Sequence, residues 1–191
     1  MLDLVLKNRS VAFRVSVKSA ISVLMVVLAV GLPQIAHVAG GASAGAVWMP
    51  MYLPALLAGC LLGWQWGLAV GALSPIASFA FTTVALGTAM PMLDRLPYMV
   101  LELAAYGVIT GLFAKKIQKN TLLAFPAVII AQLSGRVIYV IYNLIAGKSF
   151  AALMSSVQTG LVGLYLQAII VPVLVIVLAK ALMRDSKKSE E

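Results

Sequence analysis

Two ionisable side chains, Glu102 and Arg136, lie inside stretches of sequence that are otherwise apolar. Arg136 belongs to a polar series with Gln132, Tyr139 and Asn143, whose members are four, three and four residues apart. On an α-helix this spacing places the four side chains within a stripe of about 60°. A guanidinium can hold a carboxylate through two charge-assisted hydrogen bonds, and its neighbours here can donate or accept further bonds. The stripe therefore indicates binding of a polar or anionic small molecule.

Two other apolar segments carry similar stripes. Tyr98, Glu102 and Tyr106 are four residues apart, and Gln158 shares a helical face with Tyr165 in the last segment. Ionisable groups inside a membrane usually face a partner, the bundle interior or a water-filled cavity. We expect the three stripes to face one pocket in the outer half of the membrane.

A simpler interpretation is that Glu102 and Arg136 pair with each other and join two helices. The two roles are compatible, because an arginine fork can hold two partners. Trp48, at the start of the second apolar segment, is a candidate wall of the pocket or a residue of the membrane interface.

The composition excludes a sizeable soluble domain. The chain is 62% hydrophobic and only 10% charged, with a mean hydropathy of +1.04, whereas soluble domains are about 45–50% apolar and about 25% charged. Its one cysteine excludes a disulfide framework. Neither a phosphate-binding loop nor a histidine cluster nor a carboxylate pair within a span is found in the sequence. We therefore expect a protein that is not an enzyme and binds no cofactor itself.

The apolar segments predict an all-α integral membrane protein with one transmembrane domain over residues 1–191, since a span needs about 20 apolar residues. The second segment is short and begins with two prolines, and Pro172 is expected to kink the sixth or shift its register. The six expected spans are residues 12–33, 48–63, 66–86, 96–115, 121–146 and 151–180.

Basic residues gather on one side of these spans, which predicts that both termini are cytoplasmic. The net charge of +8 then reflects topology and contact with anionic lipid, and not binding of nucleic acid. A long outer loop is expected at residues 33–48. A rival interpretation takes residues 1–44 as a cleaved signal peptide, which would leave five spans. The three basic clusters are Lys7, Arg9, Arg14 and Lys18; Lys115, Lys116 and Lys119; and Lys180, Arg184, Lys187 and Lys188.

The first span carries a stripe of small residues, Ala12, Ser16 and Ala20, at its cytoplasmic end. Small residues four apart let helices approach closely in lipid. The stripe predicts either a docking face for a partner helix or packing against another span of this chain.

Over its whole length the chain resembles the substrate-binding S components of energy-coupling-factor (ECF) vitamin transporters. The likeness is strongest in "YLPALLAGCLLGWQWGLAVGALSPIASF" (52–79) and "MVLELAAYGVITGLF" (99–113). The stripe Ala12, Ser16, Ala20 is similar to the Ala-x-x-x-Ala feature by which such subunits meet their coupling partner, with a serine in the middle position.

The resemblance implies a multi-pass protein of the bacterial cytoplasmic membrane that binds a vitamin or precursor near the outer face, under the first outer loop. It also implies assembly with a transmembrane coupling protein and two ATPase subunits, which use the ATP. The motif pattern looks most like the branch with pantothenate-type members, and a carboxylate suits Arg136. If Glu102 neutralises Arg136, hydroxymethylpyrimidine or pyridoxine suits the tyrosines better.

Other functions compete with this one. A solitary ion-coupled permease or channel is the main alternative, although no repeat is evident between the two halves of the chain. A lipid-modifying enzyme and a purely structural subunit are the others. For the binding role, we expect Arg136→Ala to weaken ligand binding by more than about tenfold while the protein still folds in detergent.

Overall fold

The computed structural model describes residues 10–41 and 44–188, and the side chains among them up to residue 181. This part of the chain is built from helices, and six stretches are long and apolar enough to cross a membrane. The predicted all-α architecture with six spans is confirmed. The elements are α2 (Val11–Gly40), α3 (Ala44–Trp48), α4 (Tyr52–Leu62), α5 (Trp64–Leu86), α6 (Leu96–Lys119), η1 (Thr121–Leu123), α7 (Ala124–Ile145) and α8 (Phe150–Lys188).

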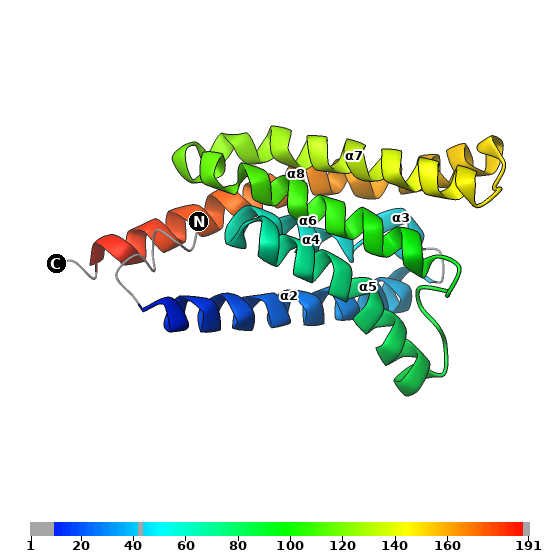
Figure 1. Cartoon of the computed structure of the whole chain (residues 1–191), viewed down its shortest axis with the longest axis horizontal. Helices are drawn as coiled ribbons and strands as arrows, with labels where there is room; N and C mark the ends of the chain where they lie inside the picture. The colour runs from blue at the N-terminus through cyan, green and yellow to red at the C-terminus, as the bar shows by residue number, and fades with distance from the viewer. Residues whose placement is uncertain (1–9, 42–43, 189–191) are drawn as a thin grey trace.

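The helices form an elongated bundle with two distinct ends (Figure 1). The start of α2, the end of α8 and the α6–α7 connection lie at one end, called here the terminal end. The α7–α8 connection lies at the opposite end, called here the far end. The sixth span continues through Pro172 as the single helix α8.

Helix α4 occupies the centre of the bundle. Every residue from Tyr52 to Leu62 except Leu53 is buried, and α4 packs against α2, α5, α6 and α8. Its sequence is apolar on all sides, which is typical of a helix surrounded by others. Tyr52, the one polar side chain at its start, is therefore directed into protein and not into lipid.

Glycines bring α5 and α6 into backbone contact beside α4. A Cβ atom at Gly107 would overlap the backbone of Gly67, and one at Gly71 would overlap the carbonyl of Leu103. Small residues four apart permit such close approach in membranes. This contact fixes α6 against the central helices and so sets the direction in which Glu102 points.

The first connection differs from the expected loop at residues 33–48. Helix α2 continues through Pro33 to Gly40, and Ala44–Trp48 form α3. A proline is better tolerated in membrane helices than in soluble ones, and this one is buried. The helix ends at Gly41, where φ is 75°, a conformation that favours glycine. The expectation of a long loop at residues 33–48 is thus wrong for the described residues, because most of that segment is helical.

The second span is a broken helix, interrupted at Met49–Met51 between α3 and α4. Pro50 disfavours helical conformation at the preceding residue, and Met49 has a φ of 47°. The interruption exposes two carbonyl groups inside the bundle. Gln167 on α8 donates its Nε2 protons to the carbonyls of Met49, at 2.8 Å, and Trp48, at 3.3 Å. An irregular backbone is tolerated at membrane depth when protein groups satisfy it in this way.

Replacing Gln167 with leucine is expected to destabilise the protein by about 1–3 kcal/mol, because two buried carbonyls lose their donor. Gln167 is only 3% exposed, so water cannot replace the side chain freely. The melting temperature in detergent measures the effect. Gln158→Leu, at an exposed glutamine of the same helix, is the matched control and should leave it unchanged. Equal melting temperatures for both variants would contradict the role of Gln167.

Candidate functional site

A buried carboxylate lies at the centre of the polar cluster that the stripes predict. Glu102 on α6 is fully buried and forms a salt bridge with Arg136 on α7, with 2.8 Å between Oε1 and Nη2. Tyr52 on α4 donates its hydroxyl proton to Oε2 at 2.8 Å, and Tyr106 donates to Oε1 at 3.3 Å. The carboxylate is therefore satisfied by three donors from three helices, and the pairing of Glu102 with Arg136 is observed.

The other side of Arg136 faces sulfur and aromatic groups. Its Nη2 lies 3.3 Å from the Met49 sulfur, and its Cζ lies 5.7 Å and 5.5 Å from the ring centroids of Tyr52 and Tyr139. Positions over aromatic faces stabilise a cation. Among the residues that the structure describes, its buried Nε has no hydrogen-bond partner. Arg136 is thus neutralised by Glu102, while its side chain keeps 12% of its area accessible.

A glycine next to Arg136 allows the cluster to form. The ring of Tyr106 lies against Gly135 on α7, where a Cβ atom would overlap the ring. Tyr106 is fully buried as a result, and its ring also packs against Tyr52, with centroids 5.2 Å apart. Gly135 therefore leaves room for the Tyr106 ring, and Arg136 beside it supplies the charge that pairs with Glu102.

A cavity of about 630 Å³ lies on the far-end side of this cluster. Its walls come from the end of α2, the break between α3 and α4, residues 89–92, and the starts of α6 and α8, with Arg136 and Tyr139 from α7. Tyr98 also lines it, with its ring edge-on to Tyr139 at 5.1 Å between centroids. Three of the predicted site residues, Tyr98, Arg136 and Tyr139, therefore line a common cavity.

Four other predicted site residues are buried outside the lining. Glu102 and Tyr106 form the cluster behind Arg136. Gln132 donates from Nε2 to the Leu164 carbonyl on α8 at 3.0 Å, and Asn143 donates from Nδ2 to the Tyr139 carbonyl at 2.8 Å. Both amides thus bond to backbone in this structure.

Gln158 and Trp48 lie on the surface. Gln158 is exposed, as is Trp48 with 52% of its area accessible, and neither is in the cavity lining. Tyr165, which shares the face of Gln158, is 69% exposed. The start of α8 instead contributes Ser156 and Thr159 to the cavity.

Sequence reasoning missed several residues of the site. Tyr52 was not among the predicted site residues, and its spacing from the exposed Trp48 gives no signal because the helix is interrupted between them. Arg95 and Lys148, which were not among the predicted site residues, both line the cavity. Met49, which contacts Arg136, was not among them either. Gly135 could not have been singled out among 15 glycines.

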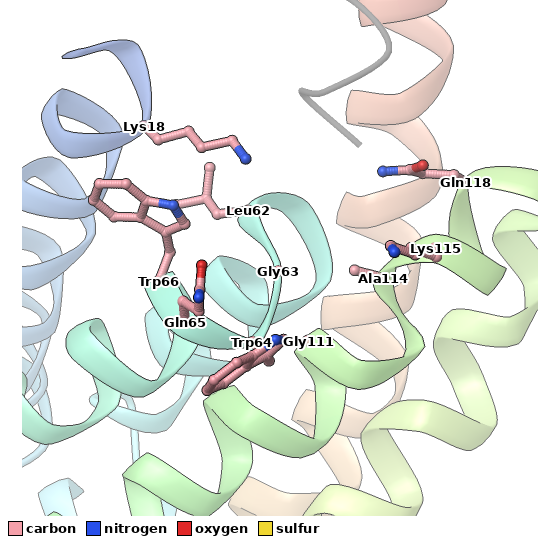
Figure 2. A pocket seen from close by; sticks show the side chains of 10 residues that line it. All are labelled: Lys18, Leu62, Gly63, Trp64, Gln65, Trp66, Gly111, Ala114, Lys115 and Gln118. Carbon is pink, nitrogen blue, oxygen red and sulfur yellow. The ribbon is translucent and has the colours of Figure 1, made fainter. Parts of the chain in front are cut away.

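A second, smaller cavity of about 190 Å³ lies at the terminal end. Figure 2 shows it around the α4–α5 connection, with Lys18 from α2 on one side and Lys115 and Gln118 from α6 on the other. Trp64 and Trp66 form part of its wall. No residue of the predicted substrate site lines this cavity in the described part of the chain, so it is a separate feature.

The stripe of small residues lies on the outside of the bundle. Ala12, Ser16 and Ala20 on α2 are all exposed. Packing of this stripe against another span of the described chain is therefore excluded, and the stripe is available to a partner or to lipid.

The family model described as "ECF transporter, substrate-specific component" matches residues 13–175. The chain belongs to this family. No curated protein and no solved structure matches it. As a substrate-specific (S) component, it is a multi-pass membrane protein and a transport subunit. Membership also implies a small-molecule substrate and, as partners, a coupling protein with ATPases that use ATP.

Proposed function

We propose that this S component captures a small water-soluble vitamin or vitamin precursor in the far-end cavity, with pantothenate as the first candidate and hydroxymethylpyrimidine or pyridoxine as the next. The observation that carries the proposal is the cavity itself, which measures about 630 Å³ and is lined by Tyr98, Arg136 and Tyr139. Ligand sites for small molecules typically measure about 300–1,000 Å³ and combine apolar walls with a few polar groups.

Charge placement supports the orientation in this proposal. The described residues of the three basic clusters lie at the terminal end, which the positive-inside rule makes cytoplasmic. The cavity lies at the opposite end and then opens to the outside of the bacterial cytoplasmic membrane. An S component so oriented receives its substrate from the exterior.

The residues have separate tasks in this proposal. Arg136, Tyr139 and Tyr98 contact the ligand, while Glu102 and Tyr106 hold Arg136 in place. Gln132 and Asn143 support the site through the backbone of α8 and α7. The exposed stripe on α2 contacts the transmembrane coupling protein, and two ATPase subunits complete the importer. Uptake into vesicles by this chain without ATPase subunits would contradict the proposal and favour a solitary permease.

Ligand binding is expected to depend on the cavity wall. Native mass spectrometry of the purified protein with a vitamin panel should identify a ligand, and calorimetry should then show affinity losses of more than about tenfold for Arg136→Ala and for Tyr139→Ala. Tyr139→Ala serves as the second variant because it leaves the buried salt bridge intact. Tyr165→Ala, at an exposed tyrosine outside the cavity, is the control and should bind as the wild type does. Unchanged affinity in both cavity variants would contradict the assignment of the site.

A further inference from the structure

Two basic side chains stand at the far-end mouth of the cavity. Arg95 directly precedes α6, and Lys148 lies in the α7–α8 connection, with its Nζ 5.6 Å from the ring centroid of Tyr98. Both side chains are exposed and both line the cavity. Within the described part of the chain, neither forms a salt bridge. The mouth therefore holds two positive charges that lack a salt-bridge partner among the described residues.

Deeper in the cavity, the lining includes the guanidinium of Arg136 and the amide of Gln34. Arg136 Nε and Gln34 Nε2 are buried, belong to lining residues and make no hydrogen bond within the described chain. The guanidinium of Arg136, whose side chain is 12% exposed, carries only donors, so a ligand that offers acceptors to it gains more than one that offers donors. The mouth and the inner part of the cavity thus both favour a ligand rich in hydrogen-bond acceptors.

The lining contains no opposing negative charge among the described residues. Glu102 is behind the wall, and both of its oxygens already accept hydrogen bonds. Asp94, next to Arg95, is exposed and lies outside the lining. A concave surface with charges of one sign and low-dielectric walls concentrates its field on a ligand of the opposite sign.

The two polar regions are separated along the helix axis. Arg95, at the N-cap of α6, and Glu102 are seven residues apart, which corresponds to about 10 Å at a rise of about 1.5 Å per residue. Tyr98, which Lys148 covers, is one turn from Glu102, or about 6 Å. A ligand that reaches both regions must be elongated.

We propose that the substrate is an elongated organic anion, whose carboxylate or phosphate group is held by Arg95 and Lys148 at the mouth while its other end presents acceptors to Arg136 and Gln34. This proposal rests on the proposed function and makes it more specific. It differs from the sequence-based expectation, because Arg136 keeps its salt bridge with Glu102 and the anion is held elsewhere. Arg95 and Lys148 then decide which vitamins bind.

Matched pairs of probes test this directly. Pantothenate and panthenol differ in a carboxylate against a hydroxyl, and pyridoxine 5′-phosphate and pyridoxine differ in a phosphate. Binding of all four, and of the wider vitamin panel, is measured by native mass spectrometry and calorimetry with the full chain in nanodiscs. The proteins are the wild type, the double variant R95Q/K148Q, and the control K115Q/K119Q, which removes the same charge from exposed residues at the terminal end.

The tightest ligand is expected to be an anion that binds at least about tenfold more tightly than its neutral counterpart. R95Q/K148Q should remove most of that preference, with little effect on the neutral compound, whereas K115Q/K119Q should behave as the wild type. Whether the tightest ligand carries a carboxylate or a phosphate then identifies the class of anion that this protein binds. A neutral or cationic vitamin as the tightest ligand, or an anion whose affinity is the same in R95Q/K148Q, overturns this proposal and leaves vitamin capture intact. Failure of every vitamin to bind the wild type overturns both.

Discussion

Arg136→Gln is expected to destabilise the protein by about 3–5 kcal/mol, the usual effect of removing one partner from a buried ion pair. The residue left behind is Glu102, whose side chain is 0% exposed. The two tyrosine hydroxyls still donate to the carboxylate, but they carry no charge to offset its burial.

Glu102→Gln is expected to cost less than Arg136→Gln. The Arg136 side chain is 12% exposed in the wild type and borders the cavity. Water and the faces of Tyr52 and Tyr139 can therefore still stabilise its charge. The double variant E102Q/R136Q should be more stable than R136Q alone, because it leaves no uncompensated charge. This order, with the double variant above R136Q, is what distinguishes a coupled pair from two independent contacts.

Melting temperatures of the three variants in one detergent test the order, with Lys119→Gln at the exposed end of α6 as a control for loss of a positive charge. If the loss in the double variant equals the sum of the single losses, the pair does not act as a unit. The double variant also separates two roles of Arg136. It removes the charge while keeping the fold, so its ligand affinity reports on contact with substrate and not on stability.

Hydropathy and helical spacing were sufficient for much of this architecture. Six spans follow from apolar length alone, and the spacing of Tyr98, Glu102 and Tyr106 correctly placed them on one face of α6. The pairing of Glu102 with Arg136 was also foreseeable, since two opposite charges in lipid have few other partners. These features could be predicted because each depends either on spacing within one helix or on a buried charge that needs an opposite charge beside it.

The partners of neutral polar residues were not predictable in the same way. Spacing shows that Gln132 and Asn143 share a face with Arg136, but an amide can be satisfied by any carbonyl within reach, and both bond to backbone. Gln167, which completes the broken second span, is a lone polar residue without a stripe, and its role depends on a backbone interruption 118 residues away. Such pairs arise from how helices are rotated against one another, which the period of one helix does not determine.

Figure 1 shows α2 along one side of the bundle. The small residues of its stripe are exposed. An exposed stripe of Ala12, Ser16 and Ala20 has little to gain from lipid, because small side chains bury little surface. Helix association in membranes depends on close backbone approach and van der Waals packing. The stripe is therefore suited to close packing against a helix of the coupling protein. The adjoining side of α2 carries larger exposed residues such as Val15.

Ser16→Trp is expected to abolish assembly with the coupling protein and ATPases, and with it ATP-dependent uptake, while ligand binding by the isolated chain stays unchanged. An indole at the centre of the stripe prevents the backbones from meeting, whereas the cavity lies at the other end of the bundle. Co-purification of the complex and uptake into vesicles measure the loss. Ser16→Ala keeps a small residue and should assemble normally. Val15→Trp adds the same bulk about 100° around the exposed helix and should do so too. Normal assembly of Ser16→Trp would place the coupling surface elsewhere, and reduced ligand binding in that variant would mean that the two ends of the bundle are not independent.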